Sequence, residues 1–227
     1  MNAPIIIPRT PYVLRAPPGA PHAGIGIDPG KDGAIVLTVG TEIRWAIWWK
    51  PAQQAKRQGF RSWFWEPGEH VAETWATTWT WATDWTCTLP DGPDVVATVE
   101  AVHGQPGKSG FEVLAEYAGR ALAWCEQLEL AIGDRPTSTT WRADLLKLPS
   151  STKADVAEQV AIDTLLGHSS GGRSITIARP FTGPMPHDLN GHVAEAALMA
   201  LWGRGYRAQP ETVTAPGNRG ARWPKPS

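Results

Sequence analysis

Three short apolar segments separated by turn residues open the central part of the chain. They span 23–30, 33–39 and 42–49, and the last shows partial alternation of apolar and polar positions. The Pro-Gly-Lys-Asp-Gly sequence between the first two is typical of a hairpin turn. The pattern therefore predicts three antiparallel strands that follow one another directly.

Further along, strands and helices are expected to alternate. The β-branched run at 94–100 is typical of a central strand, and 135–141 is interpreted as another strand. Helical spacing of apolar positions predicts four helices, at 69–85, 111–125, 152–166 and 190–202. A strand meander followed by this alternation predicts an α/β fold in which helices flank a mixed sheet.

The two ends of the chain differ in composition from its centre. Residues 1–22 are rich in proline and lack a period, which predicts a flexible arm. Residues 207–227 contain four basic residues among proline and glycine, which predicts a flexible basic tail. The folded body is expected at 23–206, and this length suits one domain with a sizeable core.

Composition argues against several classes of protein. The formal net charge is −1 and the pI is about 6.6, so any DNA contact would need a local basic patch. Cys87 and Cys125 cannot build a disulfide framework, which favours a reduced, cytoplasmic location. No apolar run is long enough to span a bilayer, and the proline-interrupted N-terminus does not resemble a signal peptide.

Carboxylates stand at the ends of two segments that are expected to form strands. Asp28 ends the first strand, directly before a glycine-containing turn, and Glu100 ends the strand that begins at residue 94. Ligands of α/β sheets gather at such strand ends, and carboxylate oxygens suit a hard cation. An ordinary turn residue at Asp28 and a solvated strand end at Glu100 are the alternatives.

A polar pair interrupts the last, otherwise apolar helix. His192 and Glu195 stand three residues apart and therefore share one face. With Asp28 and Glu100 they would form an oxygen-rich cluster with one imidazole, suited to two divalent ions, magnesium or manganese. Two such ions could promote phosphodiester hydrolysis by water. A capped histidine that pairs with Asp188 is the alternative.

Four motifs stand in the order seen in one family of nucleases. They are GIGIDPGKDGAI at 24–35, VATVEAVH at 96–103, TKADVA at 152–157 and GHVAEAALMA at 191–200. On these motifs, the body of the chain resembles RuvC-type Holliday junction resolvases, in particular their bacteriophage-like branch. The resemblance implies a ribonuclease-H-like fold with a mixed five-stranded sheet. It also implies a homodimeric, metal-dependent endodeoxyribonuclease that cuts four-way DNA junctions, in the host cytoplasm if a phage encodes it.

The resemblance further implies roles for individual residues. The expected metal ligands of the catalytic centre are Asp28, Glu100, His192 and Glu195. The family usually has Asp-x-x-Asp where this chain has His-x-x-Glu. Asp188, one helical turn before the histidine, is a candidate substitute or additional ligand. Lys153 matches a family lysine near the scissile region and would help to stabilise charge there.

Several residues are candidates for DNA contact. His103 stands where the family has an aromatic residue that opens the junction centre, and Lys108 follows in a glycine-rich loop. Arg57 and Arg61 lie in a basic, tryptophan-rich stretch at 50–67 that could stack on bases and contact phosphates. An insertion packed over the core is the alternative interpretation of that stretch.

Two other functions remain open from the sequence. A nuclease of the same fold could act on other branched DNA or on packaging intermediates. Alternatively, the departure from the family's usual last motif could mark a DNA-binding scaffold protein without catalysis.

Overall fold

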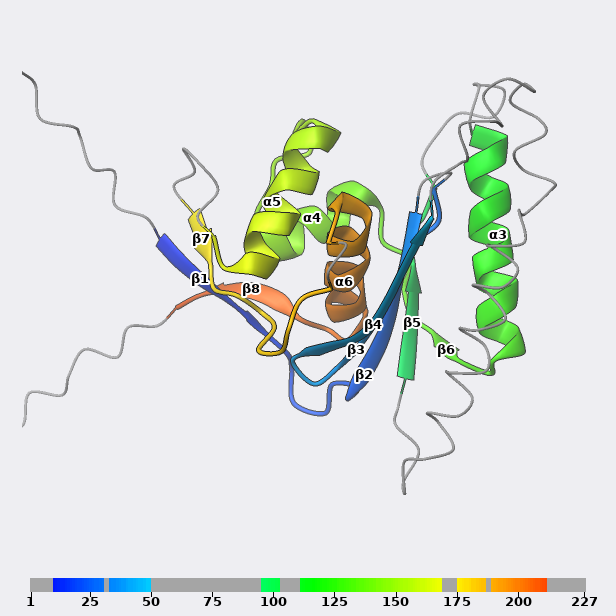
Figure 1. Cartoon of the computed structure of the whole chain (residues 1–227), viewed down its shortest axis with the longest axis horizontal. Helices are drawn as coiled ribbons and strands as arrows, with labels where there is room; N and C mark the ends of the chain where they lie inside the picture. The colour runs from blue at the N-terminus through cyan, green and yellow to red at the C-terminus, as the bar shows by residue number, and fades with distance from the viewer. Residues whose placement is uncertain are drawn as a thin grey trace, which may run out of the picture.

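The computed structural model describes residues 10–30, 33–49, 95–102, 111–168, 175–186 and 189–211. In these ranges the chain forms one sheet of five strands and one of three strands. Three helices lie between the two sheets, and a fourth covers the outer face of the larger sheet (Figure 1). The predicted site residues that the structure describes lie at the larger sheet or in the layer of helices between the two sheets. The other predicted site residues lie outside the described ranges.

The larger sheet begins with the predicted meander. Strands β2 (Ala23–Asp28), β3 (Gly33–Val39) and β4 (Glu42–Trp49) pair antiparallel in succession. β5 (Val95–Val99) lies parallel to β2, and the short β6 (Ala131–Ile132) lies parallel to β5. The strand order is β4-β3-β2-β5-β6, so the predicted α/β class with a mixed five-stranded sheet flanked by helices is confirmed.

Helices cover both faces of this sheet. In the described ranges they are α3 (Phe111–Gln127), α4 (Ser138–Leu146), α5 (Ala154–Leu166) and α6 (Gly191–Gly203). α3 lies on one face, whereas α6 lies on the other with α4 and α5 packed against it (Figure 1). The helices predicted at 111–125, 152–166 and 190–202 are confirmed, and the one predicted at 69–85 lies outside the described residues. None of the described helices is long and apolar enough to cross a membrane.

The strand predicted at 135–141 is wrong. Thr137 instead caps the N-terminus of α4, where its Oγ1 accepts a hydrogen bond of 3.1 Å from the backbone N of Thr140. The β-branched shape of threonine favours strands, and its hydroxyl group favours helix N-caps. The threonines of this segment are therefore compatible with a strand and with a capped helix. The last strand of the larger sheet is β6, which comes just before this segment.

The smaller sheet is built from the two ends of the chain. β1 (Thr10–Arg15) pairs antiparallel with β8 (Arg207–Pro210) and parallel with β7 (Ile175–Ile177). Ile177 and Ala208 are buried, and Tyr12 and Leu14 pack on the core around α6. This sheet therefore covers the side of the helical layer that faces away from the larger sheet (Figure 1).

A flexible arm is predicted at 1–22 and a flexible tail at 207–227. The structure differs from these predictions where the two segments form β1 and β8. Both β1 and β8 are ordered, because each supplies the backbone hydrogen-bond partners that the other needs. Neither segment has the alternating pattern that would predict a strand from the sequence. Residues 1–9 and 212–227 lie outside the described part of the chain.

The two faces of β2 carry different residues. Ala23, Ile25 and Ile27 pack toward α3, whereas Gly24 and Gly26 face α6. A Cβ atom on Gly26 would lie within 3 Å of backbone atoms of α6, and one on Gly24 would also be too close to that helix. Glycine at these two positions therefore lets α6 lie directly against β2, with its N-terminal end near the C-terminal end of the strand.

Candidate functional site

The C-terminal ends of β2 and β5 meet the N-terminal end of α6 at one edge of the larger sheet. Asp28 is the last residue of β2, and Glu100 directly follows β5, which lies parallel beside it. His192 and Glu195 belong to the first turns of α6. Asn190 caps this helix: its Oδ1 accepts a hydrogen bond of 3.1 Å from the backbone N of Val193. These elements bring the four predicted metal ligands to one place.

His192 is hydrogen-bonded to Asp28. Its Nδ1 lies 2.7 Å from the Oδ2 of Asp28. The Asp28 side chain is 11% exposed, so its carboxylate is held mostly away from bulk water. The contact orients the carboxylate through a neighbouring imidazole, an arrangement that is common around metal centres. Asp28 is therefore more than an ordinary turn residue.

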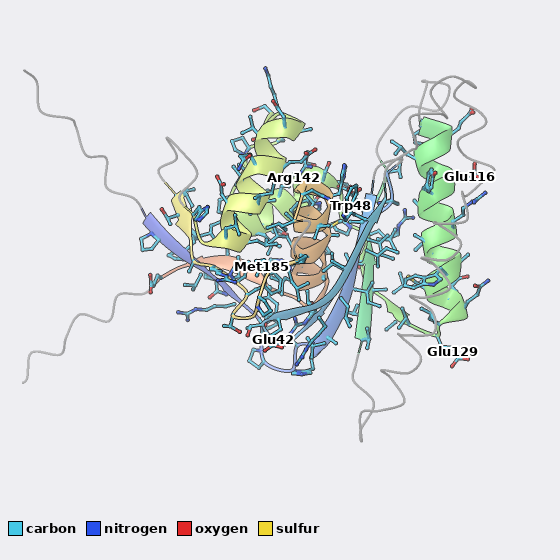
Figure 2. All side chains as sticks on the ribbon, viewed as in Figure 1. Glu42, Trp48, Glu116, Glu129, Arg142 and Met185 are labelled. Carbon is cyan, nitrogen blue, oxygen red and sulfur yellow. The ribbon has the colours of Figure 1, made fainter. Side chains whose placement is uncertain are left out.

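Glu195 forms an ion pair with Arg142 of α4. The two side chains are 6% and 16% exposed. The Arg142 guanidinium also lies 5.3 Å from the centre of the Trp141 ring, and its Nε is buried without a hydrogen-bond partner in the described part of the chain. In Figure 2 Arg142 lies beside α6, whereas Glu116 of α3 and Glu129, just after α3, lie on the other side of the larger sheet. Arg142 thus places a mostly buried cation beside the acidic cluster.

Glu100 accepts a hydrogen bond of 3.2 Å from the Nε1 of Trp141. Trp141 is fully buried, so the indole holds the Glu100 carboxylate from inside the protein. The sequence interpretation predicts neither Trp141 nor Arg142 as a site residue: it places Trp141 at the end of a strand, and Arg142 directly follows that segment. The spacing of Trp141 and Leu145 is compatible with a buried helical face, but nothing local connects that face to Glu100 or Glu195.

Burial and mutual repulsion change the acidity of the cluster. Burial raises the pKa of Glu100 to about 7; Asp28 adds to the rise, whereas the hydrogen bond from Trp141 and the charge of Arg142 oppose it. Burial raises the pKa of Glu195 to about 8 against the opposing effect of Arg142, and the Asp28 and Glu100 carboxylates add to the rise. A cation that enters the cluster would relieve this repulsion and displace the protons.

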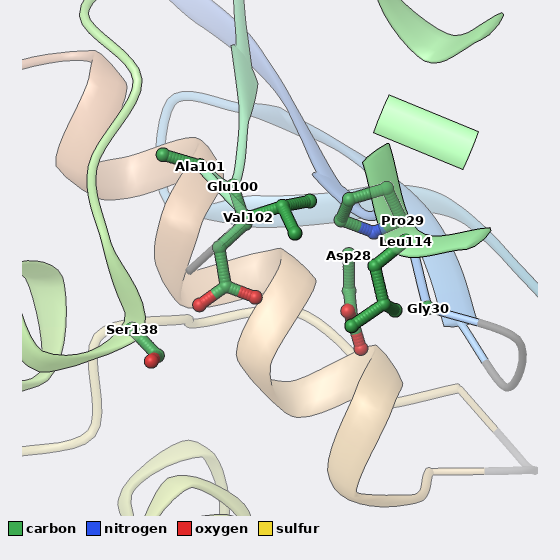
Figure 3. Close-up of a pocket in the computed structure, with 8 residues that line it drawn as sticks. All are labelled: Asp28, Pro29, Gly30, Glu100, Ala101, Val102, Leu114 and Ser138. Carbon is green, nitrogen blue, oxygen red and sulfur yellow. The ribbon is translucent and has the colours of Figure 1, made fainter. Parts of the chain in front are cut away.

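A pocket of about 180 Å³ opens beside Asp28 and Glu100 (Figure 3). Its lining residues are Asp28, Pro29, Gly30, Glu100, Ala101, Val102, Leu114 and Ser138. The Asp28 and Glu100 carboxylates provide the charged part of the lining, and Val102 and Leu114 contribute apolar surface. The pocket has room for several water molecules or for a small group of a substrate.

The chemistry of these donors fits a hard divalent cation. Carboxylate oxygens of Asp28 and Glu100 line the same pocket, and water could complete the coordination of magnesium or manganese. Among the described residues, however, no three acidic, histidine or cysteine side chains are arranged to hold a metal ion together. Glu195 is instead paired with Arg142. The centre with two divalent ions therefore stays a prediction.

The other predicted site residues do not join this cluster in the described structure. Lys153 is exposed at the N-cap of α5 and makes no side-chain cap hydrogen bond. Its catalytic role stays a prediction. The remaining candidates lie outside the described residues, and they are Asp188, His103, Lys108, Arg57 and Arg61.

Comparisons with known proteins find similarity among solved structures. No family model and no curated protein matches the chain. The chain is similar to the structure of RuvC from Thermus thermophilus, with 15% identity and a TM-score of 0.47, over 82% of this chain and 99% of that chain. It is also similar to T. thermophilus RuvC in complex with Holliday junction substrate, with 17% identity and a TM-score of 0.43, over 79% of this chain and 90% of that chain.

Proposed function

We propose that the chain is a metal-dependent endonuclease that acts on branched DNA. The observation that carries this proposal is that the carboxylates of Asp28 and Glu100, at the ends of adjacent parallel strands, line one open pocket. The largely buried Glu195 lies near enough for their charges to act on it. Buried charges of the same sign are costly unless a cation or a substrate uses them. A divalent cation is the ligand that best satisfies this set of oxygen atoms.

The proposed reaction is hydrolysis of a phosphodiester bond. A divalent cation bound by Asp28 and Glu100 would lower the pKa of a coordinated water and neutralise charge on the phosphate. His192 orients Asp28, and Trp141 orients Glu100, so both carboxylates are positioned before the cation binds. The apolar wall of the pocket would then lie against the nucleotide next to the phosphate.

Four-way DNA junctions are the proposed substrate, with a role in DNA recombination and repair. The resemblance of four sequence motifs to junction resolvases supports this choice. A homodimer is proposed as well, because resolution of a four-way junction needs two cuts and each site would cut one strand. With a net charge of −1, the chain would contact the DNA backbone through a local basic surface.

The test is cleavage of labelled DNA by the purified protein with magnesium or manganese. A four-way junction, a flap and a linear duplex of matched sequence would be compared, and the cut positions mapped. We expect paired cuts at the junction. Asp28→Asn or Glu100→Gln should abolish cleavage while junction binding survives, and wild-type rates from either variant would contradict the assigned centre.

The Arg142–Glu195 ion pair favours one second candidate, a DNA-binding scaffold protein without catalysis. In that case Arg142 holds the Glu195 carboxylate permanently in an ion pair, so this carboxylate is lost to a nuclease centre that would need it. Junction binding without cleavage in both metals would support the scaffold. Preferred cutting of flaps would support a nuclease of the same fold with another branched substrate.

A further inference from the structure

Arg142 holds a defined position beside the acidic cluster. It contacts Glu195 of α6 and lies against the ring of the fully buried Trp141. Leu145 and Leu146 are also fully buried, so the helix that carries Arg142 is anchored in the core. The guanidinium therefore places a positive charge beside these carboxylates.

The charges of the described cluster limit how many metal ions it can neutralise. When ionised, Asp28, Glu100 and Glu195 carry three negative charges, and Arg142 neutralises one of them. One divalent ion neutralises the remaining two. A second divalent ion would leave two excess positive charges among largely buried groups, which is unfavourable. His192 adds no negative charge in either of its protonation states.

We propose that the site binds one divalent cation, held by Asp28 and Glu100, and that the Arg142 guanidinium takes the place of a second. Glu195 is then a positioning residue that holds Arg142, and it is not a metal ligand. This inference rests on the proposed function, because it concerns the same centre. It differs from the two-ion centre that the sequence resemblance implies.

A guanidinium and a metal ion would serve the reaction differently. Arg142 can stabilise negative charge on a phosphate through N–H donors arranged in a plane. It cannot activate a water molecule as a Lewis acid, so activation of the attacking water would depend on the one bound cation. Cleavage should therefore depend on a single metal-binding event, without cooperativity in the metal concentration.

Manganese stoichiometry tests the inference without relying on activity. The full-length protein would be titrated with manganese chloride in a calorimeter, and electron paramagnetic resonance would detect coupling between neighbouring ions. We expect one uncoupled Mn²⁺ per wild-type chain and none in Asp28→Asn. Arg142→Met removes the charge, keeps much of the volume and frees Glu195. A second ion would then leave one excess positive charge in place of two and would gain Glu195 as a ligand, so this variant should bind two ions.

Two further variants serve as controls. Arg44→Met removes a cation from an exposed ion pair with Glu42 and should still bind one ion. Glu195→Gln tests the inference even if Arg142→Met does not fold: it should keep one ion, because Glu195 is not a ligand. Circular dichroism would show which variants are folded.

The outcomes separate this inference from the proposed function. Two ions in the wild type, one ion in folded Arg142→Met, or loss of the ion in folded Glu195→Gln would each overturn the inference. The proposed function would survive any of these results if the protein cuts a junction. A wild-type protein that binds no manganese would contradict both.

Discussion

A Cβ atom on Gly26 would lie 1.9 Å from the carbonyl oxygen of Ala196. The backbones of β2 and α6 are therefore in direct contact, with no space for a side chain between them. This contact determines how the helix lies on the strand. It thereby places His192, at the start of α6, within hydrogen-bond distance of Asp28, at the end of β2.

Gly26→Ala should destabilise the protein. The three nearest atoms to the added methyl group all belong to the backbone of α6, so the helix would have to move. We expect a loss of about 3 kcal/mol in the free energy of unfolding. Urea denaturation measures this loss. Gly119→Ala is the matched control, because its Cβ would meet no atom within 4 Å on an exposed part of α3; there we expect a gain of about 1 kcal/mol. Equal stability of the two variants would refute the close packing.

Trp141→Phe should impair both stability and cleavage. The substitution keeps an aromatic ring in the core but removes the hydrogen bond to Glu100, which costs about 1–3 kcal/mol at a buried acceptor. The Glu100 carboxylate would also lose its orientation, so single-turnover cleavage should slow while junction affinity stays unchanged. Denaturation and single-turnover kinetics would measure the two effects.

Trp202→Phe is the control for that variant. It removes a comparable hydrogen bond of 2.8 Å, to the Oδ2 of Asp144, at the opposite end of α6. It should lower stability without slowing the cleavage step. If both tryptophan variants reduce cleavage equally, the effect reflects general loss of structure and Trp141 has no special role.

The metal-free protein should lose stability as the pH rises from about 4.5 to about 8. The pKa values of Glu100 and Glu195 are raised from 4.5 to about 7 and about 8, so the folded chain binds more protons than the unfolded chain in this window. Bound protons stabilise the folded chain fully below pH 4.5, the pKa of both residues in the unfolded chain. This stabilisation is lost as the pH rises past the pKa values of Glu100 and Glu195 in the folded chain. Urea denaturation in the presence of a chelator, over a series of pH values, would measure the trend.

Glu100→Gln should flatten this pH dependence. A neutral amide cannot lose a proton, so the variant should exceed the wild type in stability at pH 8 by on the order of 3 kcal/mol and differ little at pH 4.5. Glu112→Gln, at an exposed position of α3, should follow the wild-type profile. A wild-type slope in Glu100→Gln would show that Glu100 does not titrate as described.

Arg204→Lys should also destabilise the protein. Arg204 is buried at the C-terminal end of α6, where Nε donates to the carbonyl oxygen of Pro21 and Nη1 donates to that of Gly40. These bonds of 2.9 and 2.7 Å join the entry to β2 with the turn after β3. A lysine ammonium cannot donate hydrogen bonds to both carbonyl oxygens with this geometry. We therefore expect a loss of about 2 kcal/mol in the free energy of unfolding, measured by denaturation. Arg44→Lys, in an exposed ion pair, should be neutral within about 0.5 kcal/mol.

Local patterns in the sequence were sufficient to predict most of the elements. The apolar runs at 23–49 predicted a meander, and the spacing at 111–125, 152–166 and 190–202 predicted helices, because both periods follow from backbone geometry. The prediction failed at 135–141, where serine and threonine suit a strand and also cap a helix.

Part of the candidate site was also determined by the sequence alone. Asp28, Glu100, His192 and Glu195 were selected because each interrupts or ends an apolar run, where a charged or polar group needs a partner. The structure brings these four together, since two of them end adjacent parallel strands and two begin the helix that packs on β2. Their role as metal ligands remains the proposal.

Only the tertiary structure decided what else belongs to the site. Trp141 and Arg142 contact residues 41 and 53 positions away in the chain, and β1 finds its partner β8 at the opposite end of the chain. Such pairings depend on how helices and strands pack in space, and no local period encodes them. The sequence therefore determined the four acidic and imidazole groups, whereas the packing of α4 against α6 determined that a buried arginine lies among them.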